Sequence, residues 1–300
     1  MKETVYQSQE SGMRKRNVNR ARMLISCPDR PGIVAAVSQF LYEQGANIVQ
    51  SDQYTVNPEG GMFFYRIEFD LPDLEQRLPA LQEDFTRVAD RFEMRWSVYR
   101  ASRRKRIAVF VSKEDHCLLE ILWQWQAGDL DADISMVISN HDIMRGLVES
   151  FGIPYYHIPV TPETKQEAEK KQLELTVGKV DLVVLARYMQ ILSPKFIEHF
   201  PNRIINIHHS FLPAFVGGKP YQQAYDRGVK LIGATAHYVT EELDGGPIIE
   251  QDVQRVTHRE DVNDLKRIGR HIERTVLLRA IKWHVEDRIL VYQNKTVVFV

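Results

Sequence analysis

An amide and two imidazoles interrupt an apolar run in the second half of the chain. The run INIHHSFLP, residues 205–213, carries Asn206, His208 and His209. In a strand successive side chains point to opposite faces, so Asn206 and His208 share a face and His209 points the other way. Adjacent histidines on an extended backbone seldom bind one metal, and neither HxxxH nor HExxH occurs nearby. We therefore expect no metal site here, and an ordinary core or surface histidine stays the alternative for His208.

A second polar cluster follows further along the chain. Thr235 and His237 lie in the apolar run LIGATAHYV, residues 231–239, and Asp244 precedes two glycines. Paired glycines let a backbone turn sharply and let a ligand come close. A simple turn-forming Asp is an equal alternative for Asp244, because Asp is common in turns.

The two clusters could together carry out acyl transfer. Asn206 and protonated His208 would stabilise a developing oxyanion, and Asp244 would orient a water or take a proton. No nucleophilic Ser or Cys is needed for this chemistry. The prediction requires that the two segments meet at the ends of neighbouring strands.

Alternating elements are predicted from residue 107 onward. Apolar strands are expected at residues 107–111, 134–138, 155–160, 181–186, 204–207 and 231–239, with a further strand at 292–300. Helices are expected at 117–127, from 141, 163 and 193, and at about 261–286. Such continuous apolar strands indicate burial on both faces, which predicts an open, mostly parallel α/β (Rossmann-like) sheet. Ligands bind at the carboxyl ends of these strands, and INIHHS ends one of them.

The first hundred residues show a different order. Strands are expected at 21–26, 47–56, 62–69 and 94–99, with one helix after the turn CPDRPG and another at 73–92. This β-α-β-β-α-β order predicts a ferredoxin-like unit. The basic run 100–106 is typical of a charged linker, and a nucleic-acid or localisation patch is its alternative. The expected division is therefore a flexible tail at 1–20, a first domain at 21–99, a linker at 100–106 and a second domain at 107–300.

The composition is that of an ordinary globular protein. Of 300 residues, 44% are hydrophobic and 26% charged, with a formal net charge of -1, so nucleic acid is not an expected partner. Residues 1–20 lack an apolar h-region, and no run of about 18 apolar residues follows, so we expect a cytoplasmic protein without a membrane partner. Cys27 and Cys117 show no paired spacing, so neither a disulfide nor a zinc site is expected.

The segments NIHHSFLP and GATAHYVTEELDGGPII resemble the folate-dependent formyltransferase family, which includes glycinamide ribonucleotide transformylase and methionyl-tRNA formyltransferase. The likeness runs over about residues 107–256. It implies a catalytic trio of Asn206, His208 and Asp244, with His237 and Thr235 as supporting polar groups. The segment ARYMQILS, residues 186–193, resembles the pterin-pocket loop of that family. The implied folate-binding residues are Met189, Gln190, Leu192, Val239, Thr240 and Glu241.

The segment CPDRPGIVAAVSQFLYEQGANI resembles the opening of ACT domains, regulatory modules that often bind amino acids and often pair between subunits. In such modules free amides and the helix dipole can hold a carboxylate at this turn. The resemblance implies an effector site at Asp29, Arg30 and Gly32, with glycine or methionine as the effector, and a homo-oligomer, dimer or tetramer. A turn that only starts a helix is the alternative.

An ACT module ahead of a formyltransferase-like domain is the arrangement of the formyltetrahydrofolate deformylase family. That resemblance implies hydrolysis of 10-formyltetrahydrofolate, the substrate, to formate and tetrahydrofolate, which feeds purine biosynthesis and balances one-carbon pools, with no metal or other cofactor. Two alternatives stay open: transfer of the formyl group to an amine, and a non-catalytic amino-acid sensor.

Two departures from the family pattern bear on these alternatives. His209 stands where the formyltransferase motif has Pro, and it is expected to face away from the trio. Relatives that formylate a phosphorylated amine follow their first strand with a Gly-rich phosphate loop, whereas SKEDHC, residues 112–117, has two acids and no glycine. Its carboxylates would repel a phosphate, so water is the expected acceptor.

Overall fold

The computed structural model describes residues 18–57, 60–214 and 220–300. The tail expected at residues 1–20 therefore lies outside the described residues up to residue 17. The described chain divides into two compact units. One contains the residues up to Arg104 with Glu286–Leu290 and Val297–Val300, and the other contains Lys105–Val285 with Val291–Thr296. The last fifteen residues are thus shared between the units, a division that the sequence pattern does not indicate.

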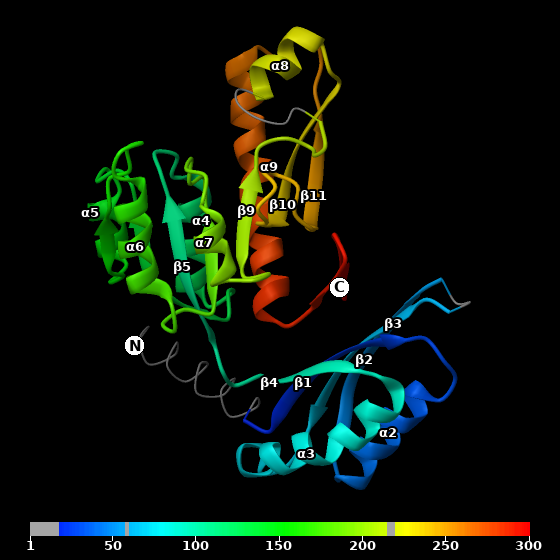
Figure 1. The fold of residues 1–300 in the computed structure, drawn as a ribbon. Coiled ribbons are helices and arrows are strands. Elements are labelled where there is room, and N and C mark those ends of the chain that lie inside the picture. The colour runs from blue at the N-terminus through cyan, green and yellow to red at the C-terminus, as the bar shows by residue number, and fades with distance from the viewer. Residues whose placement is uncertain (1–17, 58–59, 215–219) are drawn as a thin grey trace, which may run out of the picture. The chain divides into compact units, whose positions relative to one another are not determined.

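The first unit has the expected β-α-β-β-α-β order, which confirms the predicted ferredoxin-like fold. Its elements are β1 (Arg20–Pro28), α2 (Ile33–Glu43), β2 (Asn47–Val56), β3 (Met62–Asp70), α3 (Leu74–Phe92) and β4 (Arg95–Arg100). The strands pair antiparallel in the order β2-β3-β1-β4, and α2 and α3 cover one face of this sheet (Figure 1). In the core between these helices and the sheet, Phe85 packs edge-on against both Phe40 and Trp96.

A buried arginine joins the C-terminal residues of the first unit to its sheet. Arg66 on β3 is 1% exposed, and its guanidinium donates to the Asp287 carbonyl oxygen over 3.0 Å and to Glu68 over 2.9 Å. A buried guanidinium is stable only where its donors find acceptors, and Asp287 supplies one of them. This bond holds the segment Glu286–Leu290 within the first unit.

The second unit is the expected open α/β sheet, so the predicted mostly parallel fold is confirmed. Its strands are β5 (Lys105–Val111), β6 (Ala132–Ser139), β7 (Tyr155–His157), β8 (Leu182–Leu185), β9 (Ile204–His208), β10 (Leu231–Tyr238) and β11 (Ile248–Arg255). Their order is β11-β10-β9-β8-β5-β6-β7. The strands from β9 to β7 run parallel, whereas β10 is antiparallel to both of its neighbours.

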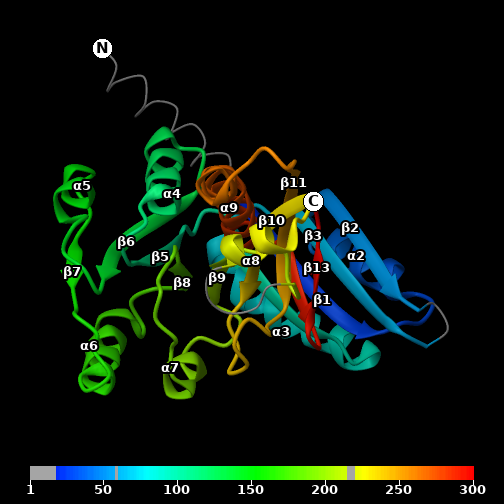
Figure 2. The same cartoon turned by 90° about the horizontal axis from the view of Figure 1, so that it is seen from above.

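Helices cover both faces of this sheet. They are α4 (His116–Ala127), α5 (Arg145–Ser150), α6 (Lys165–Thr176), α7 (Pro194–Glu198), α8 (Pro220–Arg227) and α9 (Val262–Val285). Figure 2 shows α4 and α9 on one side of the strands and α6 and α7 on the other. On the second face Phe110 of β5 packs against Phe196 of α7, within a core that also takes Ala168 of α6. Burial on both faces explains the unbroken apolar strands.

Three elements differ from the sequence expectation. Strand β11 was not expected because it lies at the edge of the sheet and its outer residues are polar and exposed. Helix α8 was not expected either. The single strand expected at 292–300 is a hairpin of β12 (Ile289–Tyr292) and β13 (Lys295–Val298), because Gln293 takes a left-handed turn with φ 54°. Among the described residues, no helix is long and apolar enough to cross a bilayer.

Candidate active site

Strand pairing brings the two polar clusters of the sequence together. In the antiparallel register of β9 and β10, His237 stands opposite Asn206 and Thr235 stands opposite His208. Asn206 and His208 are two residues apart on β9, so both fall on the same face, as the strand period predicts. Asp244 comes from the loop that joins β10 to β11. Three neighbouring segments therefore supply the side chains of one site.

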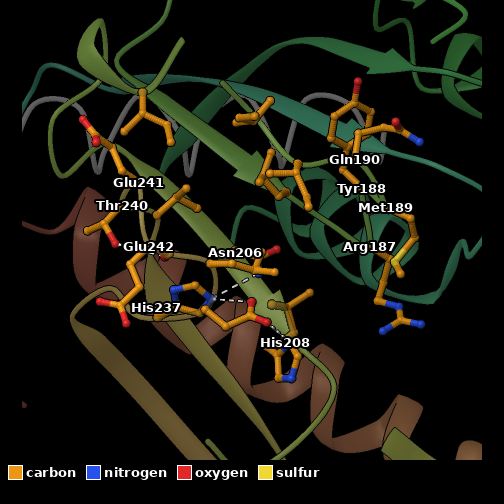
Figure 3. Close-up of a pocket in the computed structure, with 18 of the residues that line it drawn as sticks. Arg187, Tyr188, Met189, Gln190, Asn206, His208, His237, Thr240, Glu241 and Glu242 are labelled. Carbon is orange, nitrogen blue, oxygen red and sulfur yellow. Dashed lines mark hydrogen bonds and ion pairs between the residues drawn. The ribbon is translucent and has the colours of Figure 1, made fainter. Parts of the chain in front are cut away.

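Asp244 lies between two imidazoles. Its Oδ2 is 3.2 Å from Nδ1 of His208, and its Oδ1 is 3.7 Å from Nε2 of His237. Nδ2 of Asn206 lies 3.1 Å from that same Nε2. The Asp244 side chain is only 8% exposed. In Figure 3 the side chains of Asn206, His208 and His237 converge, and a dashed line joins His237 to Asn206. The predicted trio and His237 thus form one connected network.

The hydrogen bonds define which atoms remain free for a substrate. The carbonyl oxygen of Tyr238 can only accept, so Nδ1 of His237 donates to it over 2.9 Å. In the neutral ring, Nε2 of His237 accepts from Asn206, which leaves the second amide N–H of Asn206 available. Nδ1 of His208 donates to Asp244, while its Nε2 is buried without a hydrogen-bond partner among the described residues. A buried nitrogen of this kind is expected where a substrate completes the bonding.

The surroundings keep Asp244 ionised. Burial alone would raise the pKa of its carboxyl, but the hydrogen bond from His208 and the neighbouring His237 ring hold this pKa well below its usual value. The Asp244 backbone is left-handed with φ 56°, which non-glycine residues adopt at an energetic cost and mostly at functional sites. Asp244 is therefore held as a carboxylate in a fixed place.

The glycines after Asp244 allow a close approach of two backbones. A Cβ atom on Gly246 would lie 1.9 Å from the carbonyl oxygen of Tyr238, so only glycine fits there. Nδ2 of Asn294, in the hairpin turn near the C-terminus, donates to the carbonyl oxygen of Gly245 over 2.8 Å. The loop is therefore fixed on both sides, and Asn294 is a supporting residue that the sequence did not indicate.

A cavity of about 290 Å³ extends from this network along the segment after β8. It brings together all six residues predicted to bind folate. These are Met189, Gln190, Leu192, Val239, Thr240 and Glu241. Asn206, His208, His237 and Asp244 line the same cavity. The cavity thus combines the polar network at the end of β9 with the six predicted residues from the segments after β8 and β10.

The loop after β5 supports the segment that lines this cavity. Oγ of Ser112 accepts from the backbone N of Met189 over 3.0 Å and donates to Oδ1 of Asn140 over 2.7 Å. Residues 112–117, all of which the structure describes, contribute no side chain to the cavity lining. The glycine-free loop therefore positions the segment after β8.

Thr235 lies outside the cavity lining. It is fully buried; its hydroxyl donates to the carbonyl oxygen of Ser210 over 2.9 Å and accepts from the backbone N of Leu212 over 3.0 Å. Nε2 of Gln251 also donates to this hydroxyl over 2.9 Å. Thr235 thus holds the segment that follows His208.

His209 differs from its sequence expectation. It lines the cavity, with its ring centroid 5.3 Å from that of His208. The strict alternation of faces applies only within a strand, and β9 ends at His208, so the prediction for His209 was wrong. Burial and the nearby charge of Arg187 lower the pKa of His209 to about 3, so the ring stays neutral near pH 7.

A buried ionic group adjoins the cavity at Arg187, which is one of the lining residues. Oε2 of Glu273 on α9 lies 2.8 Å from Nε2 of His116 and 3.4 Å from Nε of Arg187, and its Oε1 accepts from the Tyr221 hydroxyl over 2.6 Å. We refer to these four residues as the Glu273 cluster. No sequence pattern pointed to it, because its members come from four separate segments.

Two members of the Glu273 cluster, together with Cys117, form the one set of three metal-ligand side chains found among the described residues. Ligand atoms of His116, Cys117 and Glu273 lie within 4.8 Å of one another. Burial and the Glu273 charge raise the pKa of the Cys117 thiol well above its usual value, so it holds its proton rather than acting as a thiolate ligand. These atoms fit an ion pair better than a metal site.

The predicted effector residues lie in the turn between β1 and α2 of the first unit. Gly32 has φ 94°, a left-handed conformation that glycine adopts without strain. The backbone N of Asp29 donates to the carbonyl oxygen of Gly61, and Nη2 of Arg30 donates to that of Arg91, each over 2.9 Å. These contacts build the turn, and the effector role stays a prediction.

Comparison with known proteins agrees with this organisation. The formyl transferase family model matches residues 105–281, and the ACT domain model matches residues 21–86. The formyltetrahydrofolate deformylase of Bacillus subtilis (strain 168) is 59% identical over 94% of this chain and 95% of its own length. The chain belongs to the formyltetrahydrofolate deformylase family.

Solved structures distinguish this family from the transformylases. A formyltetrahydrofolate deformylase from Pseudomonas syringae pv. tomato is 47% identical, with a TM-score of 0.90 over 99% of this chain and 100% of that one. Glycinamide ribonucleotide transformylase 1 from Symbiobacterium toebii is 32% identical, with a TM-score of 0.61 over 66% of this chain and 95% of that one. The likeness to the deformylase thus extends over both units of the chain.

Proposed function

We propose that the protein hydrolyses 10-formyltetrahydrofolate to formate and tetrahydrofolate, a hydrolase reaction at a formamide C–N bond. The deformylase relatives support this activity by their identity over nearly the whole chain. The single structural observation that carries it is the arrangement at His208, where Asp244 holds Nδ1 and Nε2 is buried without a partner among the described residues. An imidazole held in this way is ready to act on a bound substrate.

In the proposed mechanism, Asp244 holds a water beside the formyl carbon. The water oxygen bonds to that carbon, and the resulting oxyanion accepts hydrogen bonds from Nδ2 of Asn206 and from protonated Nε2 of His208. The C–N10 bond then breaks, and N10 takes a proton through His208 or water. Formate leaves as an anion, and the surplus proton of the water goes to solvent. His237 acts as a positioning residue, because it anchors the Asn206 amide.

The folate head group would occupy the part of the cavity lined by the segments after β8 and β10. The six predicted residues from Met189 to Glu241 line the same cavity as the trio, which supports this placement. The substrate supplies the one-carbon group itself, so we propose that the reaction proceeds with no metal or other cofactor. Released formate would feed purine biosynthesis and balance one-carbon pools.

Transfer of the formyl group to an amine is the alternative function, because the same trio serves both reactions. The absence of a Gly-rich loop at residues 112–117 favours water as the acceptor. The purified protein should release one formate per tetrahydrofolate formed, and this yield should not fall when amine acceptors such as glycine amides are added. A formylated amine in place of formate would identify the protein as a transferase.

We also propose an amino-acid effector at the ACT unit, with glycine or methionine as the candidates, and a homo-oligomer, dimer or tetramer, in the cytoplasm. No nucleic-acid or membrane partner is proposed. The turn at Asp29, Arg30 and Gly32 is the proposed contact, because backbone amides at the start of α2 favour a carboxylate. Calorimetric titration of the full-length protein with each amino acid should give heat that Arg30→Gln or Gly32→Val abolishes. Titrations without heat would remove the effector.

A further inference from the structure

Arg187 occupies an unusual position beside the proposed reaction site. It follows β8 closely and has a left-handed backbone with φ 61°, which costs energy for a bulky residue. The chain is fixed on each side of it, since the N of Ala186 donates to the Phe110 carbonyl oxygen over 2.8 Å and the N of Met189 donates to Ser112 over 3.0 Å. In Figure 3 the Arg187 guanidinium lies toward the end of the pocket where His208 stands, away from Gln190.

The Glu273 cluster anchors this guanidinium. Glu273 is 1% exposed and already bonds to His116 and Tyr221, so its two oxygens are held in place. Burial opposes ionisation of Glu273, but the hydrogen bond from His116 and the charge of Arg187 lower its pKa, so it is a carboxylate. Nε of Arg187 lies 3.4 Å from this carboxylate. One edge of the guanidinium is therefore directed by Glu273.

Arg187 is ion-paired through Nε, but its guanidinium is incompletely hydrogen-bonded. Nε and Nη1 are buried without a hydrogen-bond partner among the described residues, and the side chain as a whole is 13% exposed. Arg187 is also the only Arg or Lys among the described residues that line the cavity. Leaving buried charged donors unbonded is costly, which indicates that a ligand completes them.

The proposed reaction creates a ligand of the right chemistry. The substrate formamide is neutral, whereas the product formate carries a carboxylate that is ionised near pH 7. A guanidinium matches a carboxylate with parallel N–H donors, and such charge-assisted bonds are stronger than neutral ones. Arg187 is the one side chain of the described cavity lining that is always a cation, so it is the group suited to an incoming anion.

We propose that Arg187, held by Glu273, forms a carboxylate subsite that binds the formate product as it separates from tetrahydrofolate. The subsite rests on the proposed hydrolysis for its ligand. By stabilising the carboxylate that forms when the C–N10 bond breaks, it favours cleavage. It also keeps formate close to His208 until the product leaves.

Direct binding of sodium formate tests the subsite. The probe is carbon-labelled formate, whose line width is measured by NMR with full-length protein carrying tetrahydrofolate, at constant ionic strength set with sodium chloride. A ligand of three heavy atoms reaches a Kd of about 1 mM at best. The formate line of the wild type is therefore expected to broaden at millimolar formate. Arg187→Gln should weaken binding by about tenfold to a hundredfold, and Arg187→Lys should weaken it less.

Two further variants keep the result interpretable. Because Arg187→Gln alone leaves Glu273 uncompensated and can unfold the protein, the double variant Arg187→Gln/Glu273→Gln removes both charges and should lose formate binding while remaining folded in a thermal melt. Arg267→Gln removes an arginine of α9 that is 75% exposed, and it should bind formate like the wild type. Unchanged broadening in a folded double variant, or none in the wild type, would overturn the subsite. Formate release by the wild type reports separately on the proposed hydrolysis.

Discussion

Nδ1 of His208 lies 3.2 Å from Oδ2 of Asp244, and the other ring nitrogen of His208 is buried with no partner among the described residues. This relationship fixes the orientation of the imidazole and leaves one nitrogen for the substrate. The Asp244 carboxylate lies between His208 and His237, and the left-handed backbone of Asp244 places it there.

Replacing the Asp244 carboxylate should slow turnover strongly while tetrahydrofolate still binds. In Asp244→Asn the side chain has lost the charge that holds the water and orients His208, one of the two proposed oxyanion donors, so kcat should fall by about 10²–10³-fold, the loss typical when one such donor is removed. Tetrahydrofolate affinity, measured by calorimetry, should change by no more than a few fold, because the residues predicted to bind folate are other members of the cavity lining. Asp226→Asn on α8 is an exposed control and should leave both quantities unchanged. Near-normal turnover in Asp244→Asn would refute the role of this residue.

Removing the contact between His237 and the Asn206 amide should lower kcat and leave KM nearly unchanged. His237→Phe removes the acceptor for the Asn206 amide, so this amide is no longer held toward the formyl oxygen, and kcat should fall about tenfold or more. KM should change little if folate contacts are intact. Asn206→Ala should be at least as slow, and the double variant should be no slower than Asn206→Ala, since both changes act through one group. Additive losses would show that His237 acts independently.

Gly246 is predicted to tolerate no side chain. In Gly246→Ala the new Cβ would meet the Tyr238 carbonyl oxygen at 1.9 Å, so the loop that carries Asp244 must shift. Overpacking of this kind costs about 1–3 kcal/mol of stability, and turnover should fall with it. The matched control is Gly146→Ala on α5, where a Cβ meets nothing within 4 Å. Its melting temperature and kcat should stay close to those of the wild type, and equal behaviour of the two variants would contradict the close approach.

Much of the fold and of the site was predictable because both depend on local patterns. Apolar strands alternating with helices indicated the parallel sheet, and the two-residue period of β9 placed Asn206 and His208 on one face. His209 was misplaced because the strand ends one residue before it. The Glu273 cluster could not be foreseen, since Arg187, His116, Tyr221 and Glu273 meet only through packing of distant segments. Strand β11 was missed for another reason. It lies at the edge of the sheet and is partly exposed to solvent, so it lacks an apolar run.

Stability should fall as the pH drops below about 6.5. His284 accepts from the Tyr238 hydroxyl over 2.7 Å, and burial, with the charges of Lys105 and Arg203, lowers the pKa of His284 to about 3. In the unfolded chain this ring takes up a proton near the usual histidine pKa of 6.5, while in the folded chain it does not until about pH 3. Between these values stability decreases as pH falls, by up to about 1.4 kcal/mol per pH unit for one such group.

A variant can isolate this contribution. His284→Gln keeps an acceptor for the Tyr238 hydroxyl but cannot titrate, so its free energy of unfolding should depend less steeply on pH between about 6.5 and 3. Denaturant titrations at several pH values give the slope. His271→Gln changes an exposed histidine on the same helix and should retain the wild-type slope. An identical slope in His284→Gln would show that this ring does not resist protonation in the fold.

The most direct test of the hydrolysis follows the oxygen of the solvent. Purified full-length protein turns over 10-formyltetrahydrofolate in water whose oxygen carries a heavy isotope, and the formate is analysed by mass spectrometry. Attack of water on the formyl carbon predicts formate with one heavy oxygen and one ordinary oxygen, in equal amount to tetrahydrofolate, and its formation by Asp244→Asn should be about 10²–10³-fold slower. Tetrahydrofolate formed without labelled formate, or only when an amine acceptor is supplied, would contradict the proposed hydrolysis.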